Sequence, residues 1–351
     1  VGFEALEQNA ASDNVAVGYL ALDTNTSGSN NTAVGTECMD ANTTGSANVA
    51  MGYRTLDANT TGSNNVAIGQ AALGVNTTAS NNTAVGYQSA DANTTGENNA
   101  SLGASSLGGN TTGSSNTAIG MNALRDNTTA SNNTAVGLNS LLVNTTGTQN
   151  TAVGSLALDA NTTADGNTAL GYSSLSANTT GAQNTGVGRN SLDANTTASN
   201  NVALGYNALL LNTEGAQNTA IGSAALDANT TATNNTAVGF QSSSSNTTGV
   251  QNASLGSFSL NANTTGSNNI GLGHNALGSN TTGGSNTAVG ALALDANTTA
   301  SDNTAVGTNA LGANTTGNSI VAVGKNALLT TTTTSNLTAV GFEAGKANTT
   351  G

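Results

Sequence analysis

The 351-residue sequence contains no proline, no tryptophan and a single cysteine, and only 7% of its residues are charged. One cysteine, Cys38, excludes an intrachain disulfide framework and leaves the redox compartment open. One histidine, His274, excludes a cluster of Cys and His metal ligands and removes the base of a Ser-His-Asp triad. We therefore expect no enzyme activity and no cofactor, and we interpret His274 as a surface residue and Cys38 as a small core residue.

The charge balance excludes further classes of protein. Eighteen acidic residues against five basic ones give a net charge of −13, and no basic run could neutralise phosphates, so we expect no nucleic-acid partner. No stretch approaches the roughly 18 apolar residues of a membrane span, and no basic-then-apolar secretion signal is present. The chain opens with "VGFEAL", within its own pattern and without Met, so we interpret it as a segment of a longer protein.

A repeat of seventeen residues runs through the whole chain. Glycines recur at this step from Gly18, Gly35 and Gly52 to Gly341 without an insertion, and only the step from Gly2 to Gly18 is sixteen. We call these the anchor glycines and number the columns of the repeat from them. Loops at the surface of a globular domain vary in length, so an invariant step indicates that each repeat stacks directly on the next.

The columns of the repeat predict an all-β fold. Column −1 is always apolar, column −2 is only Ala, Ser or Gly, column −3 is mostly β-branched, and column +4 is usually Leu. This pattern indicates a three-residue strand, a glycine with unusual backbone freedom, a second short strand through the Ala-Leu pair, and an "NTTG" turn. The sequence predicts one continuous parallel β-solenoid, or β-roll, of about twenty coils over residues 1–351, with equivalent glycines one strand spacing apart.

Two asparagine columns are expected to form hydrogen-bonded ladders along the stack. The first is column +7 and the second is column −4. Their first members are Asn25, Asn42, Asn59 and Asn76 in column +7, and Asn31, Asn48, Asn65 and Asn82 in column −4.

Column −2 predicts association with another copy of the chain. If columns −3 and −1 point inward, strand alternation turns column −2 outward, yet it never varies beyond small residues. A second chain packed closely against it would explain this restriction. The predicted association column includes Ala84, Ser101, Ala118, Ala135 and Ala152. Columns +1 and +2 are expected to be exposed, as at Tyr19, Tyr53, Tyr87, Arg54 and His274.

The strings "DNVAVG" (13–18), "NNVAIG" (64–69) and "SNTAIG" (115–120) resemble the repeated motif of YadA-like heads of trimeric autotransporter adhesins. The full coil is also similar to repeats of bacterial and phage tail-fibre proteins that carry a self-cleaving C-terminal chaperone. The resemblance covers essentially the whole chain. It implies a left-handed, homotrimeric β-roll in an extracellular fibre, on a cell surface or a virion.

Acidic residues recur in column +5, including the neighbours Asp23, Asp40 and Asp57. Such neighbours repel, and a divalent cation would relieve the repulsion; the other interpretation is a solvated acidic edge that keeps the protein soluble. The Asn-Thr-Thr turns formally match the N-glycosylation acceptor, although a laddered asparagine could not carry a sugar. In the second half of the chain, Ala replaces Gly in column +10 every thirty-four residues, so two coils form a duplication unit.

The function predicted from these patterns is a non-catalytic, extracellular fibre shaft or adhesin-like stalk. Its expected partners are other copies of the chain and a host-surface or glycan receptor. The alternative is a self-sufficient solenoid that binds ice or a glycan through a regular Thr/Asn array. Association through column −2 favours the fibre, and a flat Thr-rich face favours the alternative.

Overall fold

The computed structural model describes residues 1–349, and these form three-residue strands joined by turns, without a helix. Two compact units divide the chain, one at Val1–Thr180 and one that begins at Gly181. The strands of the first unit are β1 (Val15–Val17), β2 (Thr32–Val34), β3 (Val49–Met51), β4 (Val66–Ile68), β5 (Thr83–Val85), β6 (Ala100–Leu102), β7 (Thr117–Ile119), β8 (Thr134–Val136), β9 (Thr151–Val153) and β10 (Thr168–Leu170).

The second unit repeats this arrangement. Its strands are β11 (Thr185–Val187), β12 (Val202–Leu204), β13 (Thr219–Ile221), β14 (Thr236–Val238), β15 (Ala253–Leu255), β16 (Ile270–Leu272), β17 (Thr287–Val289), β18 (Thr304–Val306), β19 (Val321–Val323) and β20 (Thr338–Val340). Each unit is an uninterrupted stack of coils, and a single continuous array over residues 1–351 stays a prediction.

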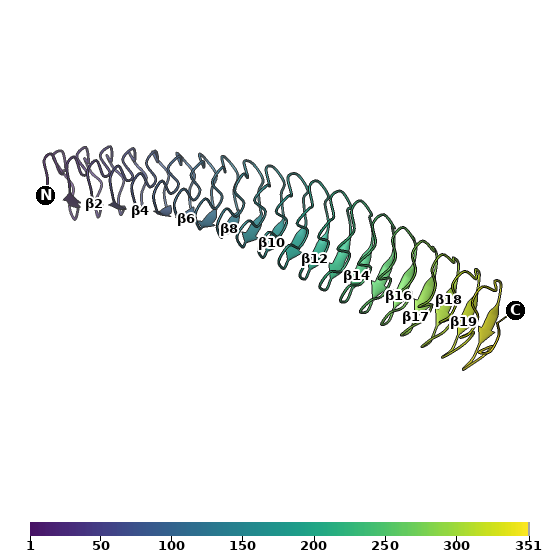
Figure 1. Ribbon diagram of the computed structural model, residues 1–351. Helices are drawn as coiled ribbons and strands as arrows, with labels where there is room; N and C mark the ends of the chain where they lie inside the picture. Colours follow the sequence, from purple (N-terminus) through teal and green to yellow (C-terminus); the bar gives the residue numbers. More distant parts are fainter. Residues whose placement is uncertain (350–351) are drawn as a thin grey trace. The chain divides into compact units, whose positions relative to one another are not determined.

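Within each unit the strands pair in parallel, each with the strand one repeat further along the chain (Figure 1). The register is that of the sequence repeat: Ala16 lies opposite Ala33, and Ala220 lies opposite Ala237. The Gly86 N–H donates to the Ile68 carbonyl oxygen at 2.8 Å, which holds one coil against the next. The predicted parallel β-solenoid with a coil of about seventeen residues is therefore confirmed.

The anchor glycine is invariant because no side chain fits there. Gly103 has a φ of 139°, a conformation that L-residues rarely adopt. A Cβ on Gly103 would lie 2.6 Å from the carbonyl carbon of Gly120 in the next coil, and this contact is with backbone that cannot turn away. Any substitution would therefore push adjacent coils apart.

The side of the coil opposite the strand is a turn, so the second short strand predicted there is wrong. Residues two and four after the anchor glycine have positive φ, for example Asn122 at 56° and Leu124 at 53°. This left-handed conformation is unfavourable for leucine. It persists because it aims backbone groups at both neighbouring coils: the Leu124 N–H donates to Ser140 O at 2.9 Å and the Asn122 N–H to Ala104 O at 3.0 Å.

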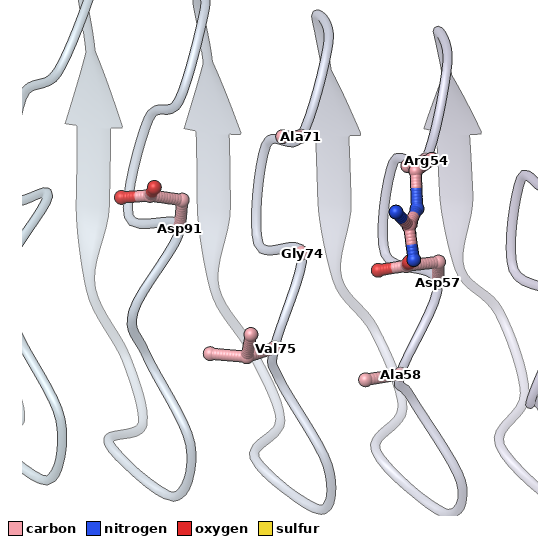
Figure 2. Close-up of a pocket in the computed structure, with 7 residues that line it drawn as sticks. All are labelled: Arg54, Asp57, Ala58, Ala71, Gly74, Val75 and Asp91. Atoms are coloured by element: carbon pink, nitrogen blue, oxygen red, sulfur yellow. The ribbon is translucent and has the colours of Figure 1, made fainter.

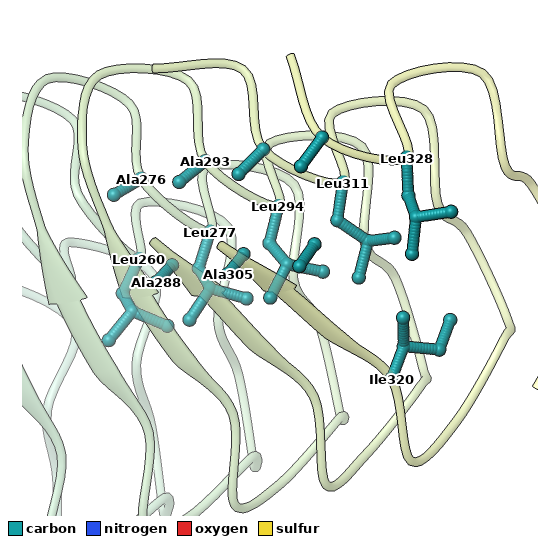
Figure 3. Close-up of a cluster of buried hydrophobic side chains, with 13 residues drawn as sticks. Leu260, Ala276, Leu277, Ala288, Ala293, Leu294, Ala305, Leu311, Ile320 and Leu328 are labelled. Carbon is teal, nitrogen blue, oxygen red and sulfur yellow. The ribbon is translucent and has the colours of Figure 1, made fainter. Parts of the chain in front are cut away.

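The apolar half of the interior is built from columns −2, +3 and +4. The leucines of column +4 are buried and form a row along the stack (Figure 3). In the second unit the row packs with alanines from columns −2 and +3. This cluster contains Leu260, Ala276, Leu277, Ala288, Ala293, Leu294, Ala305, Ala310, Leu311, Ile320, Ala322, Ala327 and Leu328.

Column −2 points into the chain's own core, which corrects the predicted association column. Ala84, Ala118, Ala135 and Ala152 are 0% exposed and Ser101 is 2% exposed, whereas Ile119 beside Ala118 is 39% exposed. The two walls of the coil are so close that Ser101 Oγ lies 2.6 Å from both Ser89 Oγ and Ser106 Oγ of column +3. Only small residues fit because the opposite wall of the same chain, and not a second chain, packs against them.

Both predicted asparagine ladders are confirmed, and they meet at one carbonyl in each coil. In column +7, Asn59 Nδ2 donates to Asn42 Oδ1 at 2.8 Å and to Gly62 O at 3.0 Å. In column −4, the Asn48 N–H donates to Asn31 Oδ1 at 2.9 Å, and Asn48 Nδ2 donates to the same Gly62 O at 2.9 Å. All members named from the sequence are at most 1% exposed: Asn25, Asn42, Asn59, Asn76, Asn31, Asn48, Asn65 and Asn82.

Candidate functional surfaces

The outer face of the strands carries about half of the exposed large apolar residues of the described chain. Columns −3 and −1 point outward, so Val17 is 42% exposed, Met51 is 46% exposed and Leu102 is 49% exposed. Exposed apolar patches that continue over several elements are typical of interaction surfaces. The sequence pattern did not reveal this face, because a column that is always apolar is also the signature of a core. The signal that could have found it is the freedom of column −1 to alternate among Val, Ile, Leu and Met while column −2 stays small.

Column +1, next to this face, holds nearly all the aromatic residues. Its exposure was predicted and is confirmed: Tyr19, Tyr53 and Tyr87 are 46%, 48% and 51% exposed, and His274 is exposed as well. Column +2 was also predicted to be exposed, but most of its residues are half-buried, and Arg54 is an exposed exception. Apart from Phe258 in column +2, every aromatic residue of the sequence belongs to column +1. They are Phe3, Tyr19, Tyr53, Tyr87, Tyr172, Tyr206, Phe240 and Phe342. The sequence pattern contained this clustering, although the column reads as variable when it is viewed residue by residue.

Of the acidic neighbours Asp23, Asp40 and Asp57, only Asp57 forms an ion pair with an arginine among the described residues. Arg54 Nε lies 3.1 Å from Asp57 Oδ2 (Figure 2). It also lies 3.3 Å from Glu37 Oε2. Burial raises the pKa of Asp40 above its usual range, and the charges of Asp23, Glu37 and Asp57 raise it further. Within residues 1–349 no three acidic, His or Cys side chains gather in a way that could hold a metal ion. The edge is half-buried, because Asp23, Asp40 and Asp57 are each only partly exposed.

An open depression of about 410 Å³ crosses three coils beside this edge (Figure 2). Gly74 has no side chain, and this leaves space between Asp57 in the preceding coil and Asp91 in the following coil. Burial is the main cause that raises the pKa of each of these two aspartates. The lining residues are Arg54, Asp57, Ala58, Ala71, Gly74, Val75 and Asp91. The depression offers a carboxylate, an ion pair and aliphatic walls, and it contains no nucleophile with an adjacent base.

The asparagines of the Asn-Thr-Thr turns from Asn42 to Asn314 are buried. Asn127 is 0% exposed, and its Nδ2 donates to Asn110 Oδ1 at 2.7 Å and to Ala130 O at 3.0 Å. Modification at this nitrogen would remove ladder hydrogen bonds and needs space that the coil lacks. The folded stack therefore does not offer these turns as N-glycosylation sites.

Cys38 and His274 occupy the structural places expected of them. Cys38 is 0% exposed in column +3, its Sγ lies 3.3 Å from Ala50 O, and burial raises the pKa of its thiol to about 12. The ring of His274 meets the ring of Phe258 edge-on, with 6.1 Å between the ring centroids. Neither residue lies beside a group that would activate it for catalysis.

Residues 1–349 contain no helix long and apolar enough to span a membrane. The chain matches no protein-family model, and no curated protein is significantly similar to it. Its surfaces are therefore the basis for assigning a function.

Proposed function

We propose that the chain is a structural segment of an extracellular fibre, a shaft or adhesin-like stalk on a cell or virion surface, and that it acts without catalysis. The observation that supports this proposal is the stacking of each unit, in which backbone pairing joins successive coils and two buried asparagine ladders run through the coils from Asn25 and Asn31 to Asn314 and Asn303. Such a stack is extended by adding coils, and each coil contacts only its neighbours. The stack also has its own core, so a partner is not needed to complete it.

The proposed association surface is the outer strand face, in place of column −2. From β1 to β10, column −1 presents exposed or half-exposed aliphatic side chains, column −3 presents Val, Thr or Ala, and neither column holds a charged residue. Burying this face against other copies would remove apolar area from water along several coils at once. The left-handed homotrimer implied by the resemblance to adhesin heads belongs to this proposal.

The test compares two triple variants of the full chain by analytical ultracentrifugation and negative-stain microscopy. Leu102→Lys, Ile119→Lys and Val136→Lys place charges on the outer strand face, and we expect the assembly to dissociate. The control is Thr112→Lys, Thr129→Lys and Thr146→Lys, which adds the same charge to exposed positions of the same coils. A monomeric parent, or equal mass for both variants, would contradict the proposal.

A second candidate is the self-sufficient solenoid that binds ice, and one observation favours it. Four successive coils present threonine on the outer strand face, beside an aliphatic residue in each: Thr117, Thr134, Thr151 and Thr168. This gives a regular array of hydroxyl and methyl groups at strand spacing. Thermal hysteresis that is lost in Thr134→Lys, while the mass stays monomeric, would favour this candidate over the fibre.

A further inference from the structure

We propose that the row of aromatic side chains in column +1 of the first unit binds a neutral, extended polysaccharide, of the β-1,4-linked glucan or chitin type. This is a binding function separate from self-association, and it concerns Tyr19, Tyr53 and Tyr87. All three lie in the unit Val1–Thr180.

The spacing of the three tyrosines is the first argument. They are separated by thirty-four residues, which is two coils, so their backbones lie about 10 Å apart along the stack. The rings of Phe3 and Tyr19, on adjacent coils, are stacked with their centroids 5.8 Å apart, which fits a one-coil step in this column and means that Phe3 covers one face of Tyr19. In a β-1,4-linked chain each sugar is turned over relative to the last, so one face recurs at every second sugar. The row therefore offers a ring at about the repeat of such a chain.

The chemistry of the row is the second argument. Between the tyrosines, column +1 holds the exposed polar residues Thr36 and Gln70. Aromatic faces therefore alternate with hydrogen-bonding groups. A pyranose chain presents the complementary surface, because its C–H faces are apolar and its edges carry hydroxyl groups. A second copy of the protein would bury more apolar surface against the continuous aliphatic row in column −1 than against this mixed row.

The electrostatics limit the polysaccharide to a neutral one. The chain has a net charge of −13, and Glu37 and Asp40 lie in the coil between Tyr19 and Tyr53. The nearby cation, Arg54, is engaged by Glu37 and Asp57. Sulfated or uronic-acid polymers would be repelled from this edge. Each tyrosine is about half exposed, so its ring can be reached without a change in the fold.

The experiment is isothermal titration of the full chain with cellohexaose and with N-acetylchitohexaose, which separates the two polymer types. We expect binding to at least one of them, and weaker binding to the corresponding tetraose and biose, because only a longer chain covers more than one ring. The triple variant Tyr19→Ser, Tyr53→Ser and Tyr87→Ser should bind about 100-fold more weakly, since each aromatic contact contributes roughly 1 kcal/mol.

The matched control is Thr112→Ala, Thr129→Ala and Thr146→Ala, which removes exposed side chains of the same unit in column +9, outside the outer strand face, and leaves the rings in place. It should bind as the parent does. Absence of binding by the parent, or equal loss in the control, would overturn the proposal. Binding that weakens with salt and is displaced by dextran sulfate would also overturn it. A tyrosine variant with unchanged binding and a reduced assembly mass would show that the row contacts another copy instead.

Discussion

Beneath the strands, the interior of each coil is filled by alanine, serine and leucine; at the other end of the same coil it is filled by asparagine. Both halves are fully buried in coils such as the one containing Leu124 and Asn127. The apolar half accepts replacements, since Cys38 and Thr55 stand in column +3 and Met39 in column +4. Column +7 is Asn without exception from Asn25 to Asn314. Packing is non-directional and needs only volume, whereas a ladder needs a donor and an acceptor at fixed positions.

The coil that contains Ile320 shows what happens where a ladder stops. Column −4 changes from Asn303 to Ile320 and then to Leu337. The Ile320 N–H still donates to Asn303 Oδ1 at 3.0 Å, but its side chain is 0% exposed and joins the leucine cluster (Figure 3). Column +7 changes in the same coil, to Thr331, whose Oγ1 donates to Asn348 O at 3.0 Å. Replacement of the ladder therefore involves both columns at once.

The largest expected effect is a charge placed in the apolar half. Ala118→Lys puts an ammonium group at a position that is 0% exposed, and we expect it to lower the free energy of unfolding by about 4 kcal/mol or more. Ile119→Lys, one residue away on the outer face, should change it by about 0.5 kcal/mol or less. Urea unfolding followed by circular dichroism measures both. Equal destabilisation would mean that the two faces of β7 are not as different as their burial indicates.

The next effect compares the two halves directly. Asn127→Leu removes two donated hydrogen bonds and leaves Asn144 Nδ2, 3.1 Å from Asn127 Oδ1, without that acceptor. Three buried groups lose a partner, so we expect a loss of about 3 to 6 kcal/mol. Leu124→Met, in the apolar half of the same coil, should cost less than about 1.5 kcal/mol. A ladder variant as mild as Leu124→Met would show that the ladder does not govern stability.

A third prediction compares two glycine columns. Gly103→Ala forces a Cβ to within 2.6 Å of the next backbone at a φ of 139°, and should cost about 3 kcal/mol. Gly108→Ala, in column +5 of the same coil, would place a Cβ 3.3 Å from Ser105 O and 3.4 Å from Asp91 Oδ1, and should change stability by less than about 1 kcal/mol. The midpoint of thermal unfolding separates the two variants. Equal midpoints for the two variants would mean that the backbone at Gly103 relaxes to accept the Cβ.

The pH dependence of stability tests the aspartates of column +5, which lie outside the apolar and the asparagine halves of the coil interior. Burial raises the pKa of Asp91 and of Asp227 above the ordinary value of 3.8. The folded state then binds more protons than the unfolded state, so this stabilisation is complete below about pH 4 and is lost as the pH rises through the folded pKa. Asp91→Asn with Asp227→Asn should reduce this slope in thermal unfolding between pH 4 and 7. An unchanged slope would mean that other titratable groups cause the pH dependence of stability.

The smallest effect concerns the reactivity of the Cys38 thiol and leaves stability unchanged. Cys38 is buried and its pKa is raised to about 12, so we expect the native chain not to react with a disulfide reagent at pH 8. After unfolding in guanidinium chloride, one thiol should react. Rapid labelling of the native chain would mean that the first three coils open readily.

The sequence predicted the candidate surfaces less well than the fold. The exposure of Tyr53 and Arg54 and the two ladders followed from columns that vary freely or never vary. Which side of each strand faces the core could not be predicted in the same way. Strand alternation places Ala118 and Ile119 on opposite sides, but it does not identify which of the two points inward. A column restricted to small residues predicts close packing, but the packing neighbour of Ser101 is Ser106 of its own chain.

By itself the sequence determined the step of the stack, the in-register pairing and the continuity of Asn25 to Asn314, because a fixed period of seventeen residues permits only coils that repeat each contact. The tertiary structure decided which side of each strand is the core and that the segment after the anchor glycine is a turn. The reason is that the width of the interior depends on the opposite wall. That wall approaches column −2 because alternating left-handed residues such as Asn122 and Leu124 fold it back, and their φ values depend on hydrogen bonds to other coils.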